Sequence, residues 1–387
     1  MLNADRKTNN VKKPLLSLLI ISFAIIFFLG VYVGLYKIFP YEVLDSSKDI
    51  LFEQKTIENN KFVNQANVYS LIKIDSKSDI DQKRDFLIEY FWDVGSFQRV
   101  KDKSQLPEVE IKISDSSYKD FQNLKRIDRL TVEMEYGINS VSYLFIPEQS
   151  NEKLILYHQG HGGDFLLGKD TIQFFLDRNF TVLAMAMPLL GMNNQPVIEI
   201  DGLGEMKLIS HKKLRLLEAN NFNPMKLFLE PVQTNLNFLD KEYNFKRYSM
   251  IGLSGGGWTT VVYSAIDERI SDSFSVGGSI PFYLRVDSRD MGDYEQTNIE
   301  LYKNVNYLEL YVLGAYGDGR QHIQIFNKND PCCFSGNGYE TYEFVIKDKM
   351  SQLGKGTFQI LIDDTHNEHK ISDHTLKLVY EMISLVN

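Results

Sequence analysis

Cysteine is almost absent from this chain of 387 residues, and its only two cysteines are the neighbours Cys332 and Cys333. Adjacent cysteines cannot join distant segments, and a disulfide between them would be strained. The sequence therefore excludes a disulfide framework and a zinc cluster built from cysteines. We expect a pair of packing thiols near the functional site, and the sequence leaves open whether they are oxidised.

The chain also lacks an excess of basic residues. Lysines and arginines number 42 against 51 aspartates and glutamates, which gives a net charge of −9. Phosphate binding needs a basic surface, so this balance argues against nucleic acid as a partner. The charge is unevenly spread, because residues 1–37 carry +4 and the remainder therefore carries −13. The length allows one large domain with appendages.

Long apolar runs are also lacking, with one exception. The stretch Pro14–Tyr36 holds no charged residue and is flanked by Lys13 and Lys37. As a helix rising about 1.5 Å per residue, it would cross a hydrocarbon core of ~30 Å. Residues 14–37 are therefore predicted as a single transmembrane anchor, with residues 1–13 as a basic cytoplasmic tail and the rest of the chain outside the cytoplasm. A cleaved signal peptide is disfavoured, because the run is long and no small-x-small cleavage site follows it.

Beyond the anchor, residues 38–124 are predicted to form a stalk and a helical extension, and residues 125–387 one large domain. Residues 127–146 alternate apolar and polar side chains, which predicts a hairpin of two half-buried strands. Short apolar strands then alternate with helices, the pattern of a mostly parallel sheet covered by helices on both faces. Residues 189–224 break this rhythm and are predicted as an insertion that forms a cap or shapes a pocket.

The pattern G-x-S-x-G occurs at residues 252–256, with Ser254 at its centre, between an apolar strand and a helix. On such a sharp turn the serine is strained, and the positions two residues before and after it must lack side chains. The helix N-terminus behind it offers backbone N–H groups to a developing oxyanion. Alone the pattern is weak, because glycine-rich turns after strands are common.

Two later strands are each followed by a residue type that a nucleophilic serine needs. Asp330 follows the strand that begins at residue 322, and His366 and His369 follow the strand of residues 357–362. A final helix is predicted from Asp373 onward. A serine, an acid and a histidine in this chain order predict a triad, in which the histidine takes the serine proton and the acid orients the histidine.

From about residue 125 to its end, the chain resembles the α/β-hydrolase superfamily, within it the branch of esterases, acetyl-xylan esterases and prolyl-oligopeptidase-like enzymes. The segments that carry the resemblance are residues 252–256, 159–163 and 267–270, with Asp330 and the pair His366 and His369. The resemblance implies the α/β-hydrolase fold, Ser254 as nucleophile, and Asp330 as the residue that orients the histidine. We favour His369 as the base, because such loops need several residues to reach back over the sheet; His366 is the alternative.

The resemblance also implies an oxyanion hole. These hydrolases place one donor in a glycine-rich loop after an early strand, here residues 158–163, and the backbone N–H of His161 is the candidate. The N–H of Gly255 would be the other donor. The family usually has histidine before the first glycine of this loop, whereas this chain has Gln159. Since the donor is a backbone group, this departure need not abolish activity.

Together these residues predict a serine ester hydrolase that acts on a small-molecule or glycan ester without cofactor or metal. Asp318 and Asp363 are fallback acids, and a metal site of Asp363, His366 and His369 matches the ligand types but not the spacing. One alternative is an oligopeptidase-like peptidase, for whose propeller the segment after the anchor is too short. The other is a catalytically dead hydrolase fold that serves as a membrane-tethered interaction module.

Overall fold

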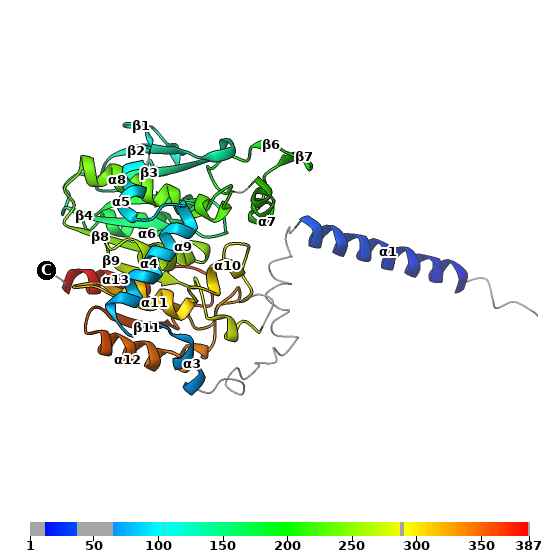
Figure 1. Cartoon of the computed structure of the whole chain (residues 1–387). Helices are drawn as coiled ribbons and strands as arrows, with labels where there is room; N and C mark the ends of the chain where they lie inside the picture. Colours follow the sequence, from blue (N-terminus) through cyan, green and yellow to red (C-terminus); the bar gives the residue numbers. More distant parts are fainter. Residues whose placement is uncertain (1–11, 37–64, 104, 221, 287–289, 386–387) are drawn as a thin grey trace, which may run out of the picture. The chain divides into compact units, whose positions relative to one another are not determined.

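The computed structural model describes residues 12–36, 65–103, 105–220, 222–286 and 290–385. The chain divides into two units, residues 1–58 and 59–387, each described by itself (Figure 1). In the first unit, helix α1 runs Lys12–Tyr36. Residues 1–11 of the predicted tail and residues 38–64 of the predicted stalk lie outside the described residues, and side chains of the predicted anchor are described only at residues 21–33. Within the described part of the chain, no helix has both the length and the apolar character needed to cross a membrane.

A nine-stranded sheet forms the centre of the second unit, in the order β1-β2-β3-β5-β4-β8-β9-β10-β11. Its six strands from β5 to β11 run parallel, because each consists of a short apolar run followed by a crossover. Their bounds are β4 Lys153–His158, β5 Thr181–Met185, β8 Arg247–Leu253, β9 Ile270–Val276, β10 Gln321–Asn327 and β11 Thr357–Asp363. The mostly parallel sheet predicted from the sequence is confirmed.

The other edge of the sheet is antiparallel. Strands β2 (Leu124–Glu133) and β3 (Asn139–Pro147) form the predicted hairpin, with β1 (Glu108–Glu110) beside β2. Strand β3 then pairs antiparallel with β5, which joins the hairpin to the parallel strands. Strand β2 is partly exposed, whereas β3 is buried along residues 142–147 and is therefore more buried than the predicted half-buried strand.

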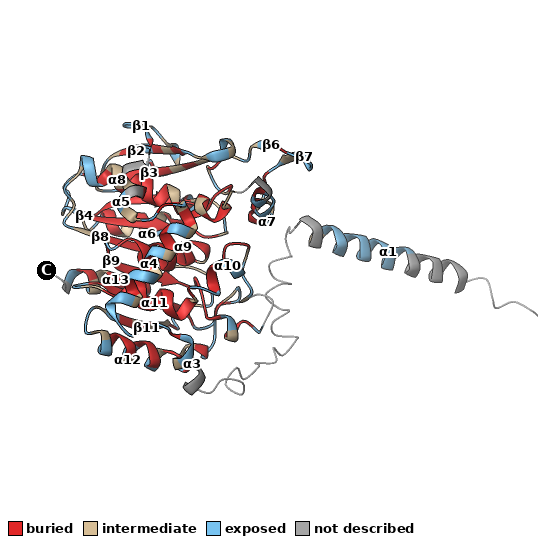
Figure 2. Ribbon diagram, in the orientation of Figure 1, coloured by how far each residue is buried: buried red, intermediate tan, exposed pale blue. Residues whose placement is uncertain are grey.

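Helices cover both faces of the sheet (Figure 1), and buried residues are concentrated in the strands and in the helix faces toward them (Figure 2). Helices α6 (Lys169–Leu176) and α13 (Asp373–Leu385) pack on one face through residues such as Phe175 and Leu376. The opposite face is covered by α4 Lys77–Trp92, α8 Glu230–Glu242, α9 Gly255–Ile266, α11 Tyr307–Ala315 and α12 Glu343–Leu353. Three further short helices are α3 Gln65–Leu71, α5 Phe97–Lys103 and α10 Ile299–Tyr302.

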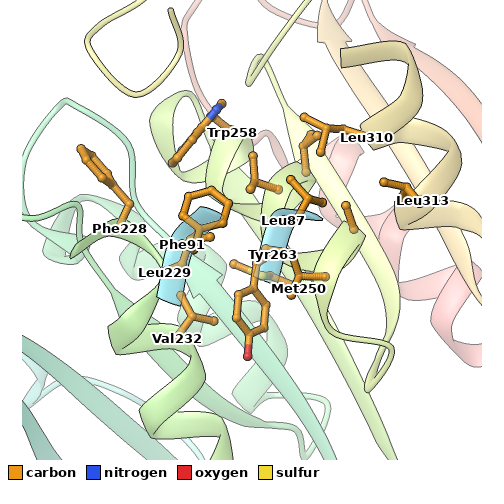
Figure 3. Packing of buried hydrophobic residues seen from close by; sticks show 14 of the residues in the cluster. Leu87, Phe91, Phe228, Leu229, Val232, Met250, Trp258, Tyr263, Leu310 and Leu313 are labelled. Carbon is orange, nitrogen blue, oxygen red and sulfur yellow. The ribbon is translucent and has the colours of Figure 1, made fainter. Parts of the chain in front are cut away.

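Helix α4, which precedes the sheet in sequence, is part of the main core. Figure 3 shows Leu87 and Phe91 of α4 beside Trp258 and Tyr263 of α9. In addition, the buried Arg84 of α4 donates hydrogen bonds to backbone carbonyls near the ends of α9 and α11. Residues 77–92 thus belong to the core of the second unit.

The insertion of residues 189–224 forms a small structure of its own. Strands β6 (Val197–Ile200) and β7 (Gly204–Lys207) pair as a two-stranded sheet, and the short helix α7 (His211–Leu214) follows. Together with α4 and the segment of residues 292–304, the residues after α7 line a cavity of about 920 Å³.

Candidate active site

The residues predicted from the sequence converge at the carboxyl ends of the parallel strands. Ser254 directly follows β8, the loop of residues 159–163 follows β4, and Gly277 follows β9. Asp330 comes three residues after β10, and His369 lies in the loop after β11. Parallel strands end at the same edge of a sheet, and open α/β sheets place their ligand sites at that edge.

Ser254 lies on a strained turn between β8 and α9. Its φ of 56° and ψ of −122° are unusual for a residue with a side chain. Its N–H donates to Val276 O at 2.8 Å, which holds the turn against the end of β9. A Cβ at Gly252 would lie 2.1 Å from Gly256 O, and a Cβ at Gly256 would lie 2.0 Å from His158 O. Both flanking positions therefore require glycine.

Asp330 and His369 form a direct pair. Nδ1 of His369 lies 2.6 Å from Oδ2 of Asp330, whose side chain is buried and also accepts a hydrogen bond from the N–H of Cys332. Asn327 donates to Lys370 O at 3.0 Å and so fixes the loop that carries the histidine. Nε2 of His369 is buried and has no hydrogen-bond partner among the described residues.

Gly277 connects this pair to the serine. A Cβ at this position would lie 3.2 Å from Cε1 of His369 and 3.7 Å from Oδ2 of Asp330. Gly277 is the neighbour of Val276, which accepts the hydrogen bond of the Ser254 N–H. The elbow, by which we mean the turn of residues 252–256 around Ser254, and the acid–histidine pair therefore meet at the end of β9. Because Nδ1 of His369 is bonded to Asp330, Nε2 is the nitrogen left to accept a proton.

The alternative histidine has a different partner. Nε2 of His366 lies 3.5 Å from Oδ2 of Asp363, and its Nδ1 accepts a hydrogen bond from the N–H of Glu368. Asp363 accepts further hydrogen bonds from Thr365, Ser372 and Thr375. Burial alone would raise the pKa of Asp363, but these hydrogen bonds outweigh burial and lower it.

The loop of residues 158–163, in which an oxyanion donor is predicted, lies against the turn at Ser254. A Cβ at Gly160 would lie 2.6 Å from Cβ of Ser254 and 3.0 Å from the nitrogen of Gly255. The N–H of Gly163 donates to Gly160 O and closes a turn in which His161 is the second residue. The hydrogen bond of this turn does not use the N–H of His161. The Gly255 N–H belongs to the first turn of α9 and has no partner within the helix.

Gln159, the departure from the family pattern, has a structural partner. Its side chain is buried and accepts a hydrogen bond from the hydroxyl of Tyr157 on β4. Beside it, burial lowers the pKa of His158 to about 4, so this imidazole is neutral at ordinary pH. His158 and Gln159 shape the loop from behind.

A cluster that sequence reasoning missed lies beside the oxyanion loop. Nε2 of His161 donates to Oε1 of Glu295 at 2.8 Å, and Nδ1 of His211 lies 3.3 Å from Oε2 of Glu295 and 3.6 Å from Oδ2 of Asp293. Burial alone would raise the pKa of Glu295, but the two histidines outweigh it and lower that pKa to about 2. Burial would lower the pKa of His211, but Glu295 outweighs it and raises that pKa. The members come from three separate segments, so no sequence spacing indicates the cluster.

The expectation of two packing thiols is wrong. Cys332 and Cys333 are joined as a vicinal disulfide, with their Cα atoms 3.8 Å apart. The tight turn after Asp330 brings the two side chains together, and the N–H of Cys332 donates to Asp330 within it. The bridge therefore belongs to the loop that carries the acid. The fallback acid Asp318 is paired with Lys355 at 2.7 Å, away from these loops.

Comparisons with known proteins show the fold. No protein-family model matches the chain, and no curated protein matches it. Among solved structures, it is similar to an acetyl xylan esterase from Paenibacillus sp. R4, at a TM-score of 0.55 and 12% identity over 84% of this chain and 100% of that one. It is also similar to an acetyl xylan esterase from Thermoanaerobacterium sp. JW/SL YS485, at a TM-score of 0.52 and 15% identity over 84% of this chain and 99% of that one. A third similar structure is a methylesterase, at a TM-score of 0.51 and 14% identity over 83% of this chain and 67% of that one. With its strand order and elbow, the chain has the α/β-hydrolase fold.

Proposed function

We propose that this protein is a serine hydrolase that cleaves carboxylic esters through a covalent acyl-enzyme. Ser254 attacks the ester carbonyl, and His369 takes its proton and later returns it to the leaving alcohol. Asp330 holds His369 in the tautomer that leaves Nε2 free and stabilises the imidazolium. The N–H groups of His161 and Gly255 stabilise the oxyanion. Water then releases the acid.

The observation that carries this proposal is the arrangement around Gly277. Ser254 on its strained turn binds the end of β9, and the His369–Asp330 pair packs against the next residue of the same strand end. An ordinary strand-to-helix turn requires neither a positive φ at a serine nor a buried acid–histidine pair beside it. His366, in contrast, is directed at Asp363.

The substrate class is an ester of a small acyl group, and the acyl acceptor we favour is a glycan. Support comes from the solved structures of similar fold, two of which are acetyl xylan esterases. The purified full chain would be assayed on p-nitrophenyl acetate, acetylated xylo-oligosaccharides and a methyl ester, beside Ser254→Ala. We expect hydrolysis of the acetyl esters and at least a ~10³-fold loss in the variant. Hydrolysis that persists in Ser254→Ala, or none with any ester, would contradict the proposal.

We further propose that residues 14–37 anchor the chain in a membrane and that the hydrolase unit lies outside the cytoplasm. The support is the charge-free run between Lys13 and Lys37 and the basic residues before it. Membranes from cells that express the full chain would be washed with alkaline carbonate, beside a chain that lacks residues 1–40. We expect only the full chain to stay with the membranes after the wash. In a second experiment, protease added to intact spheroplasts should digest the hydrolase unit, because that unit lies outside the cytoplasm. A full chain released by the wash would contradict the anchor.

A further inference from the structure

We propose that His161, His211, Asp293 and Glu295 bind one divalent transition-metal ion, with Zn²⁺ the best-suited ion. The four side chains come from the oxyanion loop, the insertion and the segment before α10. One ligand atom from each lies within 4.8 Å of the others. The sequence predicted no metal at these residues, because metal sites are found in a sequence by ligands at regular short spacings. These four residues do not have such a spacing.

Three separations between ligand atoms lie close to those around a tetrahedral ion, and one ligand atom from each residue lies within 4.8 Å of the others. Zinc bound at about 2.0–2.1 Å by nitrogen and oxygen places neighbouring ligand atoms roughly 3.3 Å apart. The observed separations are 2.8 Å for His161 Nε2 to Glu295 Oε1, 3.3 Å for His211 Nδ1 to Glu295 Oε2, and 3.6 Å for His211 Nδ1 to Asp293 Oδ2. Small shifts of the side chains therefore complete the coordination sphere.

Two buried polar atoms point into this group without a partner. Nε2–H of His211 donates to Pro188 O at 2.9 Å, which directs Nδ1 of the ring at the carboxylates of Glu295 and Asp293. Among the described residues, neither His211 Nδ1 nor Glu295 Oε2 has a hydrogen-bond partner, although His211 is 2% and Glu295 0% exposed. A ligating histidine commonly donates its second nitrogen to a carbonyl in this manner. A cation between the ring and the carboxylates would satisfy both orphaned atoms.

The surroundings hold the ligands in place and admit the ion. Tyr302, which accepts a hydrogen bond from Trp258 of the elbow helix, donates to the backbone carbonyl of Glu295 at 2.7 Å. The side chains of His161 and Asp293 are 30% and 25% exposed, so solvent reaches the group. To bind the ion through Nε2, the neutral ring of His161 carries its proton on Nδ1, so the hydrogen bond from Nε2 to Glu295 is replaced by bonds of both groups to the ion.

A site with four protein ligands is closed and therefore structural rather than catalytic. The two imidazoles favour Zn²⁺ over Mg²⁺ or Ca²⁺, which prefer oxygen ligands. The ring of His161 also lies against Gly255, because a Cβ there would lie 2.6 Å from its Cε1. The ion would thus fix the oxyanion loop against the elbow and fasten the insertion to both.

The test is metal binding by the purified full chain in detergent. The protein would be stripped with EDTA, dialysed against micromolar Zn²⁺ and analysed for bound metal, with melting temperature and the visible spectrum of the Co²⁺ form as further readouts. No reductant is added, because Cys332, Cys333 and His369 also lie close enough to bind metal once the disulfide opens. We expect one Zn²⁺ per chain, a higher melting temperature with Zn²⁺, and the absorption bands of tetrahedral Co²⁺.

The variants are His211→Gln and Asp293→Asn, with His322→Gln as the matched control, since His322 is buried outside the group. We expect each ligand variant to lower the affinity for Zn²⁺ at least about tenfold and the control to retain it. Asp293 is partly exposed, so its variant tests the site even if His211→Gln fails to fold. No bound zinc in the wild type, or the same affinity in Asp293→Asn, would overturn the proposal. Neither readout depends on esterase activity.

Discussion

At the scale of single residues, Gly277 is constrained by both its backbone and the proposed base. Its φ is +51°, and its Cα lies against the ring of His369. A side chain there would be strained by the backbone and would press on the imidazole at the same time. This residue therefore couples the end of β9 to the position of the proposed base.

We expect Gly277→Ala to lower the rate of ester hydrolysis by about 10²-fold, because its methyl group would displace His369. The matched control is Gly319→Ala, since Gly319 has a φ of +69° but open space around its Cα. Both variants would be assayed for kcat and for the urea midpoint of unfolding. An equal loss of activity in the two variants would mean that His369 is not displaced.

The sequence indicated Ser254, Asp330 and His369 because each follows its own strand in the chain order of a serine triad. The strand ends then bring His369 and Asp330 into contact, which spacing alone cannot show. Glu295 could not be found in this way. It lies in an irregular segment, and its partners His161 and His211 come from loops whose contacts depend on the tertiary fold.

At the scale of elements, the loop between β11 and α13 depends on Asp363. This buried carboxylate accepts hydrogen bonds from the loop and from the first turn of α13, where Ser372 also caps the helix by accepting from Thr375 N–H. The sequence predicted a final helix from Asp373 onward, and the predicted helix is confirmed. It gave Asp363 only as a fallback acid, because a carboxylate that orders a loop has no sequence signature.

Asp363→Asn should lower the free energy of unfolding at pH 7 by about 1–3 kcal/mol, the cost of a buried charged acceptor. The pKa of Asp363 is lowered in the folded state, so its contribution is present above the unfolded-state value near 4 and is lost as pH falls toward the folded-state value. Wild-type stability should therefore decline below about pH 4 more steeply than that of the variant. Urea unfolding between pH 2.5 and 7 measures this, with the exposed neighbour Asp364→Asn as control. If the unfolding free energies of wild type and Asp363→Asn changed with pH in parallel, the proposed role of the Asp363 carboxylate would be contradicted.

At the scale of the whole molecule, Arg84 ties the segment before the sheet to the hydrolase core. The guanidinium is buried, donates to Ala265 O and Leu313 O at 3.1 Å each, and pairs with Glu268. Positive charge at helix C-termini is favourable, because the last carbonyls lack partners within their helices. The sequence predicted a helical extension before the large domain but not the place of α4 in the core, since no sequence pattern indicates which carbonyls Arg84 binds.

We expect Arg84→Met to lower the free energy of unfolding by about 2–3 kcal/mol, because several carbonyls near the ends of α9 and α11 lose their charged donor. The comparison is Arg129→Met, which removes an exposed ion pair with Glu110 and should cost no more than about 1 kcal/mol. Urea unfolding of both variants measures the two losses of unfolding free energy. Equal shifts of the two midpoints would show that α4 is held by its apolar contacts alone.

The α/β-hydrolase fold predicted from the sequence is confirmed for the second unit, because alternating apolar strands and helices determine a parallel sheet wherever the core is large enough. The vicinal disulfide was not predicted, since its formation depends on the turn after Asp330. The central claim is that Ser254 is an activated nucleophile served by His369. It is tested most directly by labelling the purified protein with a fluorophosphonate probe, beside Ser254→Ala, His369→Ala and His366→Ala. We predict labelling of the wild type and of His366→Ala, none in Ser254→Ala, and a strong loss in His369→Ala. A folded wild type that takes no label, or labelling that survives Ser254→Ala, would contradict the account.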